Sequence, residues 1–426
     1  MRKKSKKPPK DVWQRRVTYL LYPTKAQTKI LDTWLPLHCE LYNAAIEERS
    51  SAWKIAGVSI NYNHQQDQLP EIKELRPDLI PLGSHALQAT CKRVADAYSG
   101  FFRRLKAGET PGYPRFKSRR RYKGWTWPDP AGWKLITKEK SRKATLVISN
   151  LGEIKARGKA RLPGRPVTCT ITKKGDKWYA SIVLDIRKPT AKEEPIRKHG
   201  TGEIGFDWGL ETFLTPTSGE PVENPRFLKK ELPALKKAQR ELSDKKKGSK
   251  NREKARKKVA RLHQQVERAR KDFLHKESAK LVARVSFLAT EKLGTKSMVE
   301  SDLASKGLRR SILDAAPATF LSMIRYKAEE AGSRFTEIET RIAKPSQRCP
   351  ECFLLCGKKP LEQREHLCPH CGWRGPRDLA SARVILQWAK GRRPPGWGPA
   401  EDRGGKGEPF PEKRETPCLA RSASVG

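Results

Sequence analysis

The sequence predicts a multidomain α+β protein, with an N-terminal β-barrel carrying inserted helices and a C-terminal α/β domain carrying a cysteine knuckle. Three observations support this prediction. Apolar residues recur at helical spacing in two N-terminal segments, then at a period of two around Lys174-Gly175-Asp176. Strand and helix patterns alternate from residue 202 to residue 390. The length of 426 residues, with 36% apolar, allows two to four domains with real cores.

The elements of the N-terminal half follow from these periods. Pro23-Thr24 is a helix start, and Pro36 is expected to kink the helix that follows it. The expected elements are a strand at 16–22, a helix from 24 and a second helix at 84–106, then hairpin strands at 167–173 and 177–186. A charged linker at 187–200 follows.

The sequence of the C-terminal half predicts strands separated by helices. Ser218-Gly219 suits a hairpin turn, and Gly248-Ser249 breaks a long run of strong helix formers. The expected elements are a strand at 202–208, a basic helical hairpin at 226–284, a helix at 318–332, a strand at 334–342 and a helix at 378–390. Beyond 391, proline, glycine and charged residues predict disorder.

Basic residues greatly outnumber acidic ones. The chain has 90 lysines and arginines against 47 aspartates and glutamates, a net charge of +43. Such an excess favours a polyanionic partner, because neutralising phosphates releases their counterions. We expect nucleic acid, bound by several surfaces, since basic clusters lie at 3–10, 115–123, 229–280 and 374–393.

The sequence also indicates the compartment. No apolar stretch is long enough to cross a bilayer, and the basic segment 1–10 is followed by Asp11 and Gln14 rather than by a signal-peptide core. We expect a protein that stays in the cell and has no membrane partner. Five of the nine cysteines lie between Cys349 and Cys371, which in a reducing compartment favours a metal site over disulfides.

Three acidic residues are candidates for a catalytic metal site: Asp207, Glu291 and Asp378. Glu291 follows Asp207 by 84 residues and Asp378 follows after another 87, so the three can meet only through a folded sheet. Carboxylates that hold two Mg²⁺ ions would supply the charge neutralisation and activated water that phosphodiester cleavage needs. For any one of them alone, a solvated charge or a helix cap is the simpler interpretation. The apolar flanks of Asp207 favour the metal site, because a buried acid without a cation is costly.

Two cysteine pairs predict a structural zinc ion. Cys349 and Cys352 form one CxxC pair, and Cys368 and Cys371 form the other. A set of buried free cysteines is the alternative. Other possible ligands, for which a closed four-cysteine site leaves no role, are Cys356, His366 and His370.

Several short motifs, in order along residues 16–390, resemble one protein family. The matching residues are Leu21-Tyr22-Pro23-Thr24, Gln27, Tyr42-Asn43, Leu87-Gln88, Phe101-Phe102, Pro114-Arg115-Phe116-Lys117, Ser249-Lys250-Asn251, Gln347-Arg348-Cys349 and Arg377-Asp378. With these motifs the chain resembles the TnpB family, transposon-encoded RNA-guided DNA endonucleases similar to the small type V CRISPR effectors. Trp208, Pro376 and Ala380 depart from the family pattern but leave the three carboxylates intact.

The resemblance implies a domain plan. It implies a wedge barrel with recognition helices, then a RuvC domain of RNase H fold that is split by the helical hairpin and the zinc knuckle. The expected boundaries are a basic arm at 1–15, the wedge barrel at 16–190 with its helical insert at about 24–125, the RuvC domain at 201–390 with the hairpin at about 226–284 and the knuckle at about 346–374, and a disordered tail at 391–426.

The resemblance also implies partners: a guide RNA and a target DNA, bound in the cytoplasm of a prokaryotic cell near its nucleoid. Polar side chains of the N-terminal half are expected to read DNA bases, and basic ones to hold phosphates. The expected nucleic-acid contacts are Tyr42, Asn43, Gln88, Arg115, Lys117, Arg119, Arg120, Arg121, Lys250 and Arg252.

Three functions follow from this reasoning. The favoured one is an RNA-guided endonuclease that recognises a short DNA motif beside its target and cuts DNA. The second is an RNA-guided DNA-binding repressor, against which the three retained carboxylates argue. The third is a guide-independent nuclease or recombinase resembling a Holliday-junction resolvase, whose chains are shorter and lack the N-terminal half and the knuckle.

Overall fold

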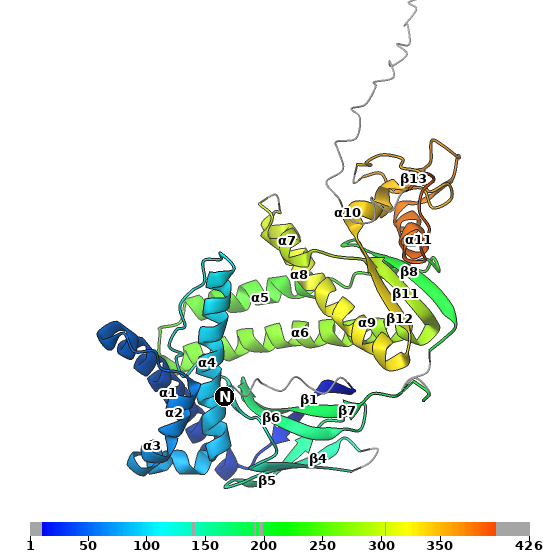
Figure 1. Cartoon of the computed structure of the whole chain (residues 1–426). Coiled ribbons are helices and arrows are strands. Elements are labelled where there is room, and N and C mark those ends of the chain that lie inside the picture. The colour runs from blue at the N-terminus through cyan, green and yellow to red at the C-terminus, as the bar shows by residue number, and fades with distance from the viewer. Residues whose placement is uncertain are drawn as a thin grey trace, which may run out of the picture. The chain divides into compact units, whose positions relative to one another are not determined.

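The computed structural model describes residues 11–138, 141–190, 193–195, 199–302, 304–360 and 362–397. These residues form two compact units, and the boundary between them falls after Thr190. Each unit has its own sheet and its own hydrophobic core (Figure 1). No helix in the described ranges is long and apolar enough to span a membrane.

The helices of the first unit lie between its first two strands. Thr24 and Gln27 form a capping box at the start of the longest helix, and Pro36 lies within that helix without ending it. The helices are α1 (Lys25–Ala56), α2 (Tyr62–Asp67), α3 (Leu69–Leu75), a 3₁₀ turn (Pro77–Leu82) and α4 (Ser84–Lys106). Buried residues of α1 and α4 pack against Tyr122 in a small separate core.

A seven-stranded antiparallel sheet completes the first unit. Its strands are β1 (Val12–Tyr22), β2 (Gly124–Trp127), β3 (Trp133–Thr137), β4 (Lys143–Ile148), β5 (Gly152–Arg157), β6 (Arg165–Lys174) and β7 (Lys177–Arg187). The order is β2-β6-β7-β1-β5-β4-β3. Because β1 pairs with both β7 and β5, residues 12–15 belong to this strand and not to a basic arm. Residues 1–10 of the predicted arm lie outside the described part.

The prediction of a barrel is wrong, because the sheet is open. Its two edge strands, β2 and β3, have only four and five residues, and no ladder joins them in the described structure. They are connected instead by residues 128–132, where Pro128 and Pro130 lack the N–H groups that pairing requires. The short loop still brings Trp127 and Trp133 into one core, so the sheet curls without closing.

The second unit has a five-stranded mixed sheet in the order β10-β9-β8-β11-β12. The first three strands are antiparallel, whereas β11 is parallel to both β8 and β12. The strands are β8 (Gly202–Trp208), β9 (Thr212–Pro216), β10 (Val222–Glu223), β11 (Val285–Glu291) and β12 (Arg334–Ile338). The strand predicted at 334–342 is therefore shorter, and Thr340–Ala343 form the helix α10.

Helices connect these strands. The predicted helical hairpin is present as α5 (Phe227–Ser243) and α6 (Lys250–Arg284), with its turn at Gly248, whose φ is 88°. The remaining elements are α7 (Thr295–Glu300), α8 (Lys306–Ala315), α9 (Pro317–Ala331), β13 (Glu365–Leu367), β14 (Arg374–Pro376) and α11 (Arg377–Ala389). Residues 372–376 lead from Cys371, the last cysteine of the knuckle, into α11.

The sheet of the second unit is covered on both faces (Figure 1). Ile204, Phe206 and Trp208 pack with residues of α6 and α9. Phe287 and Ala289 of β11 pack with residues of α11. Since side chains alternate along a strand, Gly205, Asp207 and Glu291 are placed on the face that α11 covers.

Of the segment beyond 391 that is predicted to be disordered, the structure describes residues 391–397. The rings of Trp397 and Trp388 lie 5.2 Å apart between centroids, edge to face. Apolar packing on α11 therefore holds this segment. Residues 398–426 lie outside the described part.

Candidate functional site

Asp207 and Glu291 lie side by side at the carboxyl ends of two parallel strands. Phe206 of β8 pairs with Thr290 of β11, so each acid follows a paired position. The Thr290 hydroxyl donates a hydrogen bond to the Phe206 carbonyl oxygen at 3.2 Å, which fixes this register. Both acids are half-buried.

Asp378 joins them from α11. It lies in the first turn of α11, which packs against β8 and β11. Gly205 permits this close packing, because a Cβ atom there would lie 2.4 Å from the Ala382 carbonyl oxygen. The three acids predicted to form a site therefore come from three elements that meet at one end of the sheet.

The electrostatics of Asp207 reflect this convergence. Burial raises the pKa of Asp207 well above its usual range, and the charges of Glu291 and Asp378 raise it further. The Trp208 backbone and Arg377 act in the opposite direction. Burial also raises the pKa of Glu291. A divalent cation near Asp207 would stabilise its ionised form against both burial and the charges of its two neighbours.

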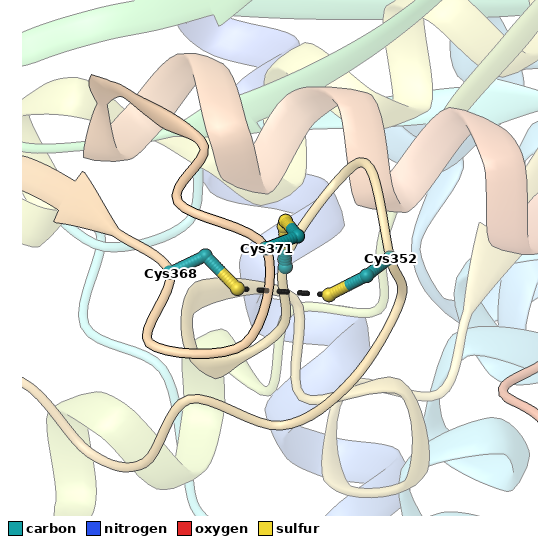
Figure 2. Close-up of side chains that lie close together, drawn as sticks. Cys352, Cys368 and Cys371 are labelled. Atoms are coloured by element: carbon teal, nitrogen blue, oxygen red, sulfur yellow. Dashed lines mark hydrogen bonds between the residues drawn. The ribbon is translucent and has the colours of Figure 1, made fainter.

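The four predicted cysteine ligands lie together. Their sulfur atoms are all within 4.8 Å of one another, and Figure 2 shows the sulfurs of Cys352 and Cys368 facing each other, with Cys371 close by. The Cys349 and Cys371 sulfurs are 3.7 Å apart, and those of Cys352 and Cys368 are 3.6 Å apart. This cluster could hold a metal ion. The Cys356 sulfur is also 3.6 Å from that of Cys368, although Cys356 is outside the four-cysteine set.

Backbone groups support the thiolates of this cluster. The Glu351 N–H points to the Cys349 sulfur and the His370 N–H to the Cys368 sulfur, each at 3.4 Å. Burial alone would raise the pKa of Cys368, but N–H groups of Cys371 and His370 help to lower that pKa to about 6. Burial raises the pKa of Cys349 to about 12, so of these two thiols Cys368 is the one whose thiolate the backbone favours.

Arg392 ties the knuckle to α11, a role that the sequence analysis missed. Its guanidinium donates to the carbonyl oxygens of Pro350, at 3.3 Å, and of Glu351, both between the first two cysteines. It also donates to the Gln387 side chain and lies over the Phe353 ring. The only signal in the sequence is a basic pair, Arg392-Arg393, after an aromatic helix end.

Comparisons with known proteins identify relatives of this chain. Residues 181–302 match the OrfB_IS605 family, described as a probable transposase, and residues 318–385 match the Cas12f1-like TNB domain. A candidate RNA-guided DNA endonuclease of Streptomyces pristinaespiralis is 30% identical over 387 residues, covering 88% of this chain and 89% of that protein. The chain belongs to the TnpB family of RNA-guided DNA endonucleases.

Two further comparisons extend the match. InsQ of Escherichia coli K12, also a candidate RNA-guided DNA endonuclease, is 28% identical to this TnpB-family chain and covers 81% of it, with 85% of InsQ matched. Among solved structures, the Cas12f1 chain of a Cas12f1-sgRNA-target DNA complex has a TM-score of 0.56 and 12% identity, covering 88% of this chain and 99% of that one. The two chains therefore share a fold.

Two residues expected to read DNA bases are used inside the TnpB-family fold. Tyr42 is buried, with its ring centroid 5.9 Å from that of Tyr122. The Asn43 side chain donates to the Lys117 carbonyl oxygen at 2.9 Å and accepts from the Lys117 N–H at 2.8 Å. Gln88 is partly exposed on α4. Of these three, Gln88 has a side chain that remains accessible to a ligand, and its role stays a prediction.

The predicted basic contacts also divide into two kinds. Arg252 donates to the carbonyl oxygens of Leu242 at 2.9 Å and Lys245 at 2.6 Å, so it caps α5 and closes the hairpin. The Lys117 ammonium lies 4.2 Å from the centroid of the Tyr42 ring. The remaining predicted cations are exposed and accessible to phosphates: Arg115, Arg119, Arg120, Arg121 and Lys250.

Proposed function

We propose that this chain is an RNA-guided DNA endonuclease that cuts DNA at Asp207, Glu291 and Asp378. The observation that carries the proposal is the convergence of these acids, strong enough for Glu291 and Asp378 to raise the pKa of Asp207. The names of the two relatives in Streptomyces and Escherichia support the same activity. The retained acids favour cutting over the alternative of a repressor that binds DNA with little or no cleavage.

The three carboxylates fit a pair of Mg²⁺ ions. Carboxylate oxygens are hard ligands of the kind that Mg²⁺ prefers. Bound there, the ions would neutralise charge on the scissile phosphate and supply an activated water. The protein's own part is to hold the carboxylates. The Thr290 hydroxyl fixes the strand register, and the close packing of α11 at Gly205 places Asp378.

The second unit fits a RuvC-like domain of RNase H fold. Its five strands include three antiparallel strands followed by two parallel ones, and all three acids lie at one end of the sheet. The hairpin of α5 and α6 is inserted between β10 and β11, and the knuckle lies just before α11. This is the split arrangement that the family resemblance implies.

The cysteine cluster fits one structural zinc ion. Zinc–sulfur bonds of about 2.3 Å at tetrahedral angles require sulfur atoms roughly 3.8 Å apart. Two sulfur pairs within the set, at 3.7 and 3.6 Å, meet this requirement. Four thiolates close the coordination sphere, so the metal there would stabilise the fold rather than bind substrate.

A guide RNA and a target DNA are the proposed partners. The net charge of +43 favours binding to two polyanions at once, in the cytoplasm of a prokaryotic cell that also holds its nucleoid DNA. Base pairing with the guide would select the target, while the protein holds the heteroduplex by its shape. Gln88 and the exposed arginines near residue 120 are the proposed contacts to the DNA beside the target.

Alanine variants of the acids test this function. Asp207→Ala, Glu291→Ala and Asp378→Ala should each lower the cleavage rate in Mg²⁺ buffer by about 100-fold or more, because each carboxylate helps to hold the cations. Binding of guide and target should remain nearly intact. Glu223→Ala, at the exposed edge of the same sheet, is the matched control. Cleavage at the normal rate by any of the three variants would refute the assignment of the site. If the wild-type protein binds target DNA with its guide but does not cut it, the repressor function would be favoured.

A further inference from the structure

An exposed group of aromatic rings lies at the end of α4, outside the cleavage site. Phe101 and Phe102 are in the last turns of α4, and Tyr113 follows in the next loop. Ring centroids of Phe101 and Phe102 are 5.2 Å apart, and those of Phe101 and Tyr113 are 5.4 Å apart. Tyr98 lies beneath them, 5.5 Å from Tyr113. The four residues form one continuous cluster, called here the aromatic platform.

The platform is rigid on its inner side and open on its outer side. The Tyr98 and Tyr113 hydroxyls are hydrogen-bonded at 3.0 Å, and the Arg49 guanidinium lies 5.4 Å from the Tyr98 ring centroid. Tyr98 is only 8% exposed, whereas Tyr113 is 45% exposed and Phe102 is 52% exposed. Leaving two large rings in water costs free energy without a folding benefit, so a ligand that covers them would be favoured.

Charges around the aromatic platform identify the chemistry of that ligand. Arg103 and Lys106 occupy the last turn of α4 and are exposed. The Arg115 guanidinium lies 3.7 Å from where a Cβ atom on Gly112 would be, next to Tyr113. Glu109 is the one acid in the described segment 101–117. Aromatic rings bordered by cations suit a flexible polyanion with flat apolar faces, as single-stranded nucleic acid has.

We propose that the aromatic platform stacks unpaired bases of the DNA strand that the guide displaces from the target. This inference rests on the proposed function. When a guide pairs with one strand of a duplex, the other strand is left with exposed base faces and phosphates. Phe102 and Tyr113 provide ring faces for two such bases, and Arg103, Lys106 and Arg115 lie within reach of the phosphates between them.

Binding of single-stranded DNA by the full-length chain tests the stacking step without any guide or cleavage. The probes are a labelled thymidine homopolymer and a matched strand of abasic sites, which keeps the phosphates but lacks base faces. Phe102→Leu should weaken binding to the thymidine strand about fivefold or more and leave binding to the abasic strand unchanged. Phe102→Trp, which keeps a stacking ring, should bind like the wild type. Trp53→Leu removes a 63% exposed ring of α1 and is the matched control.

A second measurement identifies the strand. The fluorescent base 2-aminopurine, whose emission is quenched by stacking, is placed in the displaced strand or in the guide RNA of a complex formed by the Asp207→Ala variant. Phe102→Leu should restore emission from the displaced strand, and Phe102→Trp should keep it quenched. Restored emission from the guide RNA alone would overturn the assignment to DNA. Equal binding of thymidine and abasic strands by the wild type would overturn stacking, whether or not the chain cuts guided DNA.

Discussion

At the scale of one residue, the proposed role of Asp207 lowers the stability of the folded protein, because a cation ligand must be ionised although it is buried. Burial and the charges of Glu291 and Asp378 raise its pKa well above the usual range. The folded protein therefore holds a proton on Asp207 more tightly than the unfolded chain does. The stability gained is fully present below the unfolded pKa, about 3.9, and is lost as pH rises through the folded value. A bound cation would remove this cost.

Asp207→Asn should therefore stabilise the protein when Mg²⁺ is absent. At about pH 7 the variant should melt at a higher temperature than the wild type, since its amide carries no charge to bury. At about pH 4 the gap should narrow, because the wild-type carboxyl is then protonated. Added Mg²⁺ should raise the melting temperature of the wild type more than that of the variant. A variant that melts below the wild type at neutral pH would contradict this account.

Asn43 and Gln88 have similar side chains, but we expect a structural role for Asn43 and a recognition role for Gln88. Asn43→Ala should lower the free energy of unfolding by about 1–2 kcal/mol, because it leaves the N–H and carbonyl of Lys117 without their partners. It should also weaken binding to every target alike. Gln88→Ala should change stability by no more than about 0.5 kcal/mol but alter which flanking bases are accepted.

Denaturant unfolding measures the first effect of these two variants, and a screen of randomised flanking DNA measures the second. If Gln88→Ala accepts the same flanking motif as the wild type, other residues must recognise that motif. A changed motif in Asn43→Ala, with unchanged stability, would restore Asn43 as a base reader.

At the scale of elements, hydrogen bonds join the knuckle to both ends of α11. The chain passes from Cys371 into α11 within six residues, and Arg392 binds back from the far end of α11 to the loop between Cys349 and Cys352. The Arg377 guanidinium also donates to the Pro360 carbonyl oxygen at 2.8 Å. The knuckle is thus held at both ends of the helix that carries Asp378.

Removing one ligand should therefore affect both elements. Cys371→Ser should lower the zinc content of the purified protein and its melting temperature, since zinc binding contributes folding energy to a loop without a core of its own. Cleavage should fall as α11 loses its anchor. Cys356→Ser, which removes a nearby thiol outside the set of four, should keep one zinc ion. Elemental analysis that finds no zinc in the wild type would count against the site.

At the scale of the whole molecule, the net charge predicts how salt affects the binding of nucleic acid. The net charge of +43 is spread over both halves of the sequence, so no single patch carries the affinity. Salt should weaken binding steeply for this reason. We expect the exposed arginines near residue 120 to contribute to this effect without reading sequence.

Replacing Arg119, Arg120 and Arg121 together by alanine should flatten the salt dependence of DNA binding. Each phosphate that loses its cation in the variant should reduce the slope of log K against log salt concentration by about 0.9 for duplex DNA. The weakening should be the same for targets with different flanking sequences. A slope equal to that of the wild type, measured by titration at several salt concentrations, would show that these arginines do not bind phosphates.

Local sequence patterns predicted the positions of several helices and the candidate zinc ligands. Helical spacing located α4, and the turn at Gly248 located the α5–α6 hairpin. CxxC spacing selected the four cysteines that the structure brings together. These features were predictable because a period or a ligand spacing depends only on neighbouring residues. The family motifs then predicted the order of the domains along the chain.

Contacts between distant residues were decided only by the tertiary structure. Asn43 and Lys117 are 74 residues apart, and no local pattern indicates that the amide clamps that backbone. The same holds for the contact of Arg392 with the knuckle and for the edge strands β2 and β3, which do not pair with each other although a loop joins them. The sequence determined which residues have the right chemistry, but packing determined which of those side chains remain free to meet a ligand. A side-chain donor or acceptor that is hydrogen-bonded within the protein is not available to bind a nucleic-acid base.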